Sequence, residues 1–230
     1  MVLSYATILV GLIVALAIAI YAFKRHELSE GGTMAALFVG LTIFVLGGWS
    51  WFLILIVFFV TSSLFTKYKK EKKKAVNEVF EKGGTRDFWQ VFANGFLPVL
   101  FASLYFLNPE RAEFFVGFVA AIATVTADTW ATEIGVFFKN PRSLFTFKKV
   151  PAGTSGAVSW QGLLVAFGGA LLIGLVAVLF NGFNNSLLDD LPGFIASQFV
   201  GGKKFILFIG IAGFIGALAD SLIGATIQAN

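Results

Sequence analysis

The chain contains no cysteine, one histidine and few charged residues, and each scarcity excludes a class of function. Without cysteine the protein has no disulfide bond and no thiolate metal site. The single histidine, His26, lies in a charged segment, where it cannot complete a Ser/His/Asp triad inside a membrane. Charged residues make up 13% of the 230 residues, whereas a soluble domain carries about 25%. The composition therefore predicts an integral membrane protein.

Hydrophobic residues make up 57% of the chain and gather in seven blocks, each near the ~20 residues that a membrane-spanning helix requires. The blocks cover residues 2–23, 32–48, 50–65, 88–107, 113–138, 159–180 and 204–227. We therefore predict one all-α domain over residues 1–230: three helices in 1–65, a basic loop in 66–87 and a four-helix core in 88–230. The second and third blocks are joined through Gly47 and Gly48, which indicates a tight hairpin. The first block lacks the pattern of a cleaved signal peptide, so we expect it to remain as a helix.

Lysine and arginine gather on one side of these predicted helices. The residues on that side are Lys24, Arg25, Lys67, Lys69, Lys70, Lys72, Lys73, Lys74, Lys82, Arg86, Lys139, Arg142, Lys148 and Lys149. Only Arg111, Lys203 and Lys204 fall on the other side. Because short cytoplasmic loops are enriched in basic residues, we expect a multi-pass protein of the cell membrane, with its N-terminus outside and its C-terminus in the cytoplasm.

Acidic residues inside apolar blocks are costly and therefore indicate function. Asp128 and Glu133 lie in the fifth predicted helix, and Asp220 lies in the seventh. Thr124, Asp128 and Thr132 recur every fourth residue and share one helix face, whereas Glu133 points away from it. In the seventh helix, Asp220 and its neighbour Ser221 lie in a segment where small and polar residues also recur every fourth residue, at Gly216, Gly224 and Gln228.

Further polar residues gather near the same predicted membrane face. Asp87, Gln90 and Asn94 share one face at the start of the fourth helix, beside Arg86. The segment before the sixth helix contains glycines and hydroxyl groups that can turn backbone N–H groups toward an anion; these are Gly153, Thr154, Ser155 and Ser159, after Lys148 and Lys149. We expect all of these residues to line one pocket that opens to the cytoplasm.

The chemistry of these residues suits phosphoryl transfer. Mg²⁺ prefers one or two carboxylates together with substrate phosphates, so we predict that Asp128 and Asp220 hold it, with Asp87 or Glu133 as an additional carboxylate. Arg86, Lys148 and Lys149 would neutralise the phosphoryl oxygens, and the reaction needs little more than positioning and charge stabilisation. Asp128, Asp220, Arg86 and Lys149 are the predicted catalytic residues.

Four segments of the chain, 84–95, 127–135, 153–159 and 219–228, resemble motifs of a known membrane family. It is the family of transmembrane protein 19 and the phytyl-phosphate kinase of the vitamin E pathway. The resemblance implies a CTP-dependent kinase that converts a prenyl phosphate into its diphosphate. It places the polar motif residues of the family at Arg86, Asp87, Gln90, Asn94, Asp128, Thr129, Glu133, Gly153, Thr154, Ser155, Ser159, Asp220, Ser221 and Gln228.

Two other functions remain open. Asp128, Glu133 and Asp220 also suit an ion- or proton-coupled transporter, although a transporter site is expected near the membrane midplane. A cytidylyltransferase that forms a CDP-lipid would use the same nucleotide and break a different bond. The expected partners of a kinase are an isoprenoid monophosphate such as phytyl or geranylgeranyl phosphate, a nucleoside triphosphate and the lipid bilayer. A homo-oligomer is compatible with the sequence, and no nucleic-acid recognition module is present in it.

Overall fold

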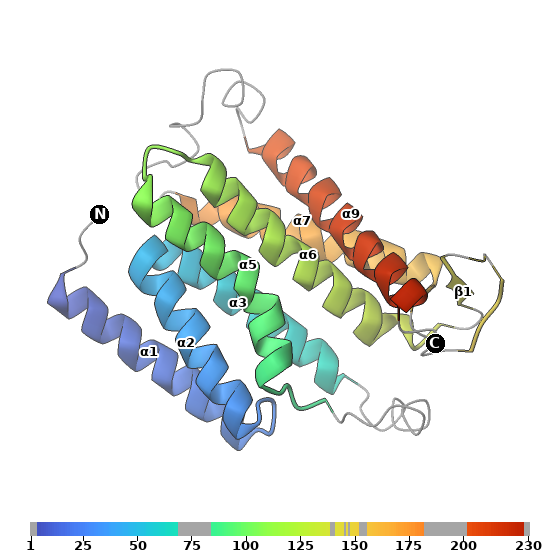
Figure 1. The fold of residues 1–230 in the computed structure, drawn as a ribbon, viewed down its shortest axis with the longest axis horizontal. Helices are drawn as coiled ribbons and strands as arrows, with labels where there is room; N and C mark the ends of the chain where they lie inside the picture. Colours follow the sequence, from blue (N-terminus) through green and yellow to red (C-terminus); the bar gives the residue numbers. More distant parts are fainter. Residues whose placement is uncertain are drawn as a thin grey trace.

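Seven long apolar helices make up most of the structure, which is a computed structural model describing residues 4–68, 84–138, 141–144, 146, 148–151, 156–181 and 202–227. These helices are α1 (Tyr5–Lys24), α2 (Glu30–Gly47), α3 (Trp49–Lys67), α5 (Phe88–Leu107), α6 (Glu113–Gly135), α7 (Trp160–Asn181) and α9 (Lys203–Ile227). They run side by side in one bundle (Figure 1). The predicted all-α membrane bundle is therefore confirmed. Most of the predicted basic loop, residues 69–83, lies outside the described residues.

Polar caps and a glycine turn set the ends of the N-terminal helices. Ser4 and Ser29 accept hydrogen bonds from the backbone N–H groups of Thr7 and Gly32, at 3.1 and 3.0 Å, and so cap α1 and α2. Such caps satisfy backbone donors that have no partner within the helix. Gly48 alone separates α2 from α3 and has a φ of 81°, which favours glycine. The predicted hairpin is thus built around this residue.

The two ends of the bundle differ in charge. Because successive helices alternate in direction, α1, α3, α6 and α9 finish where α2, α5 and α7 begin (Figure 1). We call this the basic end, because it carries the described basic residues Lys24, Arg25, Lys67, Arg86, Arg142, Lys148 and Lys149. Helix α1 begins at the opposite, far end. The assignment of the basic end to the cytoplasm stays a prediction.

A core of aromatic and branched side chains lies among α3, α6, α7 and α9. Trp51 of α3 is fully buried, and its ring lies 4.5 Å from that of Phe118 and 5.0 Å from that of Tyr105. Phe205 and Ile209 bring α9 into the same cluster. Within a membrane these contacts stabilise the bundle by close packing, since lipid tails are as apolar as the side chains.

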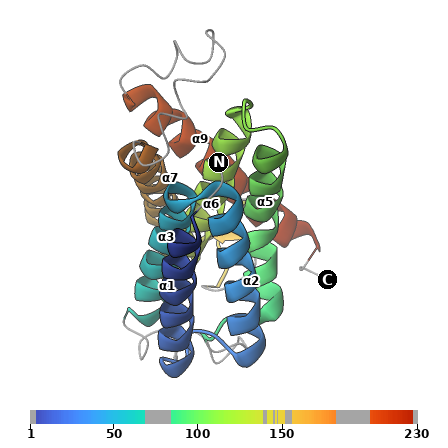
Figure 2. The same cartoon turned by 90° about the vertical axis from the view of Figure 1, so that its left-hand side faces the viewer.

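Small residues allow α9 to lie closely against α6 and α7. A Cβ atom on Gly213 would lie 2.8 Å from the Cβ of Ala123 and 2.9 Å from that of Ala170. A Cβ atom on Gly216 would collide with the side chain of Thr124. Figures 1 and 2 show α1 and α2 on one side of the bundle, with α7 and α9 on the other. The close approach therefore fixes the position of the C-terminal helix within one half of the bundle.

Helix α5 connects the two halves and contains Pro98. Proline has no N–H group, so the carbonyl of Asn94 lacks its usual helical donor. Before Pro98, a Cβ on Gly95 would lie 2.6 Å from the Val39 side chain of α2. After Pro98, Phe101 fills the space beside Gly117 of α6. The two parts of α5 thus pack against different helices.

Candidate functional site

Asp128 of α6 and Asp220 of α9 form an acidic pair in the half of the bundle nearer the basic end. Thr124 and Gly216 each lie one turn before these acids, and they are in direct contact. Because α6 and α9 run in the same direction, this contact places Asp128 and Asp220 side by side on the next turn. The charge of Asp220 therefore acts on the Asp128 carboxylate. Asp128 is half-buried and Asp220 is exposed, so the pair can be reached from outside the helices.

This pair has the donor set that suits Mg²⁺, namely two carboxylates with room for oxygen ligands from a substrate. Across the described ranges no third His, Cys, Asp or Glu joins a group that could hold a metal ion. Within these ranges, neither Asp87 nor Glu133 therefore joins the pair as a third carboxylate. Both of those acids have other contacts.

Glu133 faces α3 rather than α9, in agreement with its predicted separation from Asp128. Its Oε1 atom accepts a hydrogen bond of 2.7 Å from the Thr66 hydroxyl. Its charge also acts on Arg86. Glu133 thus belongs to a second group of polar residues at the basic end, and it connects this group to the helix of Asp128.

Asp87 and Gln90 form a capping box at the start of α5. The Asp87 carboxylate accepts from the Gln90 N–H at 2.9 Å, and the Gln90 side-chain oxygen accepts from the Asp87 N–H at 3.2 Å. This exchange satisfies two backbone donors of the helix. Both residues therefore have a structural role, and ligand binding by them stays a prediction.

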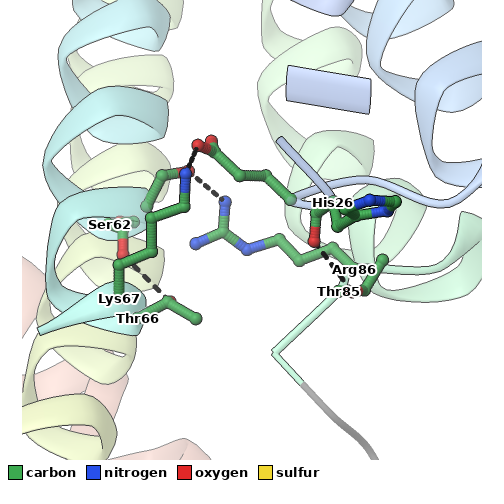
Figure 3. Close-up of polar contacts among 8 residues, drawn as sticks. His26, Ser62, Thr66, Lys67, Thr85 and Arg86 are labelled. Carbon is green, nitrogen blue, oxygen red and sulfur yellow. Dashed lines mark hydrogen bonds and ion pairs between the residues drawn. The ribbon is translucent and has the colours of Figure 1, made fainter. Parts of the chain in front are cut away.

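Arg86 is held in place through its backbone. Its N–H donates to the carbonyl of Glu27 at 2.9 Å, and its carbonyl accepts from the N–H of Ser29 at 3.0 Å. The neighbouring Thr85 hydroxyl donates to the carbonyl of His26 at 2.8 Å (Figure 3). Gly32 lies so close to the Arg86 carbonyl that a Cβ atom there would collide with it. The segment that precedes α5 is thus fastened to the turn between α1 and α2.

The guanidinium of Arg86 points toward α3 (Figure 3). Its Nη1 atom lies 3.4 Å from the Ser63 hydroxyl, and its carbon lies 5.7 Å from the centre of the Phe59 ring. Burial lowers the pKa of Arg86 from its ordinary value, while the charges of Glu133 and Glu27 oppose this change. Glu27 itself pairs with Lys67 of α3. The Nη2 atom is buried and has no hydrogen-bond partner in the part of the chain that the structure describes.

The described residues divide the predicted site into two groups. Arg86 and Asn94 line a cavity among α1, α2, α3 and α5, and neither Asp128 nor Asp220 is found among the residues that line it. The acidic pair lies instead between α6 and α9. That all of the predicted residues line one pocket stays a prediction.

The segment between α6 and α7 lies at the basic end. Its two short strands, β1 (Arg142–Ser143) and β2 (Ala157–Val158), pair antiparallel, and β2 contacts α9. Lys148 and Lys149 are exposed, and Lys149 forms an isolated bridge with Arg142. The pairing keeps these lysines near the end of α9 where Asp220 lies. Gly153, Thr154 and Ser155, and also Gln228 at the C-terminus, lie outside the described residues.

The remaining predicted residues have local partners. Ser159 accepts a 3.1 Å hydrogen bond from the N–H of Gly162 in the first turn of α7. Thr129 donates a 2.7 Å hydrogen bond to the carbonyl of Val125 within α6. Ser221 is half-buried beside Asp220.

Sequence reasoning missed the polar residues that surround Arg86. They are His26, Glu27, Ser63, Thr66 and Lys67, which together with Arg25, Gly84 and Arg86 line a small cavity at the basic end. The hydroxyls at positions 62, 63 and 66 in an otherwise apolar block were the available signal. They lie within one helical turn of each other, close to the basic end.

The fold and these two groups define a polytopic α-helical membrane protein with an acidic pair and a partly buried arginine at one end. The chain belongs to the family Integral membrane protein DUF92, whose model matches residues 13–230. It is 33% identical to Protein PGR of Arabidopsis thaliana over 235 residues, which covers 95% of the chain and 78% of that protein. An uncharacterised membrane protein of Methanocaldococcus jannaschii is 30% identical over 220 residues, covering 95% of the chain and 82% of the relative.

A further relative is Protein VTE6, chloroplastic, of Arabidopsis thaliana. It is 29% identical over 206 residues, which covers 87% of the chain and 56% of that protein. No solved structure matches the chain.

Proposed function

We propose that the protein transfers a phosphoryl group from CTP to an isoprenoid monophosphate in the membrane, giving the diphosphate and CDP. The observation that carries this proposal is the pairing of Asp128 and Asp220 near the basic end, beside the segment with Lys148 and Lys149. The resemblance of four motifs to the family of the phytyl-phosphate kinase supports the class of substrate, and the chain is also similar to Protein VTE6. Isoprenoid monophosphates of the phytyl or geranylgeranyl type are the expected acceptors.

Different residues would position the substrates and neutralise their charges. Asp128 and Asp220 would hold Mg²⁺, which when bound supplies positive charge to the phosphate oxygens that it contacts. Lys148 and Lys149 would bind the nucleotide phosphates, and Arg86 would bind the acceptor phosphate. An oxygen of the acceptor attacks the γ-phosphorus, and the bond from that phosphorus to the bridging oxygen breaks, so that CDP leaves. No general base is needed, because a phosphate monoester is already anionic at neutral pH.

The position of the acids favours this reaction over transport. A transporter site lies near the membrane midplane and opens alternately to both faces. Asp128 and Asp220 lie in the half of their helices nearer the basic end, and Asp220 is exposed. This arrangement suits an enzyme that joins a soluble nucleotide to a lipid at one membrane face.

The test is a transfer assay with purified protein, geranylgeranyl phosphate, Mg²⁺ and γ-labelled CTP. We expect label in a lipid diphosphate, and we expect Asp128→Asn and Asp220→Asn each to lower the rate at least a hundredfold. Glu113→Gln is the matched control, because Glu113 starts the same helix as Asp128 but lies at the far end. A CDP-linked lipid product would identify a cytidylyltransferase instead. Absence of nucleotide turnover, or full activity in both aspartate variants, would overturn the proposal.

A further inference from the structure

We infer that the cavity among α1, α2, α3 and α5 binds the apolar tail of an isoprenoid phosphate, with the phosphate group at Arg86. This inference deepens the proposed function and rests on it for the identity of the lipid. It places the tail in a cavity that neither Asp128 nor Asp220 lines. We call this space the tail cavity.

The tail cavity is open on one side, and its lining suits a hydrocarbon chain. Its empty volume, which includes the open space at its mouth, is about 760 Å³. Its walls are almost wholly apolar and include Phe52, Leu55 and Ile56 of α3. Ala36 and Gly40 of α2 leave room where longer side chains would fill the space. Such a wall suits a flexible hydrocarbon chain.

Arg86 lies where this apolar space meets a polar one. It lines the tail cavity, and it also lines the small cavity with His26, Glu27 and Lys67 at the basic end. A group bound at the guanidinium would therefore have an apolar volume on one side and polar side chains on the other. This is the arrangement that an amphiphile with one charged end requires.

The guanidinium also has a nitrogen that remains for a ligand. Its Nη2 atom is buried without a hydrogen-bond partner among the described residues. A buried donor left without a partner is costly, and an anionic oxygen forms a strong charge-assisted bond with arginine. The two acids that act on Arg86 have other partners, since Glu27 pairs with Lys67 and Glu133 accepts from Thr66. A phosphate oxygen at Nη2 would satisfy the buried donor.

The position of the guanidinium is fixed before any ligand binds. The two backbone hydrogen bonds to Glu27 and Ser29 hold Arg86 on the turn between α1 and α2. The ring of Phe59 lies 5.7 Å from the guanidinium carbon. A pre-positioned group loses less conformational freedom on binding, which favours affinity. Asn94 adds an amide to the lining of the cavity, two turns into α5.

The experiment measures binding of labelled geranylgeranyl phosphate to the full chain in detergent, without nucleotide and without Mg²⁺. Ala36→Phe places a large side chain in the tail cavity, and Ala93→Phe is its control, because Ala93 is exposed on α5 and is not among the residues that line the cavity. We expect Ala36→Phe to weaken binding about tenfold or more and to weaken binding of the shorter farnesyl phosphate less. The control should leave both affinities unchanged.

Arg86 is tested by comparing lipids that differ only in the headgroup. We expect Arg86→Ala to weaken geranylgeranyl phosphate about tenfold or more and to leave geranylgeraniol, which lacks the phosphate, unchanged. Inorganic phosphate at millimolar concentration should not displace the lipid, since it has no tail. Displacement by inorganic phosphate at such concentrations would show a simple anion site and would overturn the assignment of the tail.

A second measurement needs no variant. Geranylgeranyl phosphate with a photoreactive group on its tail should crosslink to peptides of α2 and α3. Crosslinks confined to α7 or α9, or equal binding by Ala36→Phe and Ala93→Phe, would overturn the inference. Failure of the proposed function looks different, because binding would then occur as described while no label is transferred from CTP.

Discussion

The Thr66 hydroxyl donates a 2.7 Å hydrogen bond to Glu133 and thereby joins α3 to α6 at the basic end. Through this contact the helix of Asp128 is tied to the group of residues around Arg86. We expect Thr66→Val to lower the stability of the protein by about 1 kcal/mol, the usual net value of such a bond. In a chain of this length that corresponds to a fall in Tm of about 2–4 °C.

Thr61→Val is the matched control for this prediction. Thr61 lies on the same helix, and its hydroxyl donates to the carbonyls of Val57 and Phe58 in that helix. It therefore joins no other helix. Equal Tm values for the two variants, measured by thermal unfolding in detergent, would show that the bond between α3 and α6 contributes nothing.

Gly32→Ala is expected to displace Arg86. The added methyl group collides with the Arg86 carbonyl. Such crowding lowers the stability of the folded state by roughly 1–3 kcal/mol. We expect at least a tenfold loss of transfer activity, with a weaker affinity for the lipid phosphate. Gly168→Ala is the control, because nothing lies within 4 Å of a Cβ at that position. If Gly32→Ala behaves like Gly168→Ala, the backbone of Arg86 is not held as described.

We expect the acidic pair to lower the Tm when no metal is bound and to raise it when Mg²⁺ is bound. Asp128 and Asp220 repel each other, so Asp220→Asn should raise the Tm by a few degrees when EDTA is present. Mg²⁺ should raise the Tm of the wild type, since a ligand that binds only the folded state stabilises it. It should leave the Tm of Asp220→Asn almost unchanged. A variant that Mg²⁺ stabilises as much as the wild type would place the metal elsewhere.

The orientation in the membrane can be measured by labelling, because the chain has no cysteine of its own. Thr146→Cys places a thiol at the basic end, and Glu110→Cys places one at the far end; both positions are exposed. The distribution of basic residues predicts a cytoplasmic basic end. A membrane-impermeant maleimide added to intact cells should therefore label Glu110→Cys and spare Thr146→Cys until the cells are opened. The reverse labelling pattern would show that the basic end lies outside the cell.

The helices could be predicted because each is an apolar run of membrane length. Helix geometry also predicted that Glu133 points away from Asp128, since five residues rotate a side chain through about 500° and leave the two about 140° apart. Pairing of Asp128 with Asp220 followed from two acids in small-residue segments, which allow helices to approach closely. These features depend on local periodicity, which is visible in a single sequence.

The surroundings of Arg86 could not be predicted in the same way. Its backbone bonds to Glu27 and Ser29 join segments that are distant in the chain and carry no periodic pattern. The expectation of one pocket stays a prediction, because a shared membrane face does not decide which helices are neighbours. Asp87 and Gln90 were assigned to binding, although their spacing is also that of a capping box, which is what the structure contains.

Pro98 divides α5 into two parts that can move separately. The part before it carries Asn94 and packs against α2 through Gly95, and the part after it packs against α6 through Phe101. Bending at the missing hydrogen bond would let the first part follow α2 while the second part stays with α6. One wall of the tail cavity can then move, and the cavity can widen toward the bilayer, without disturbing the helix that carries Asp128.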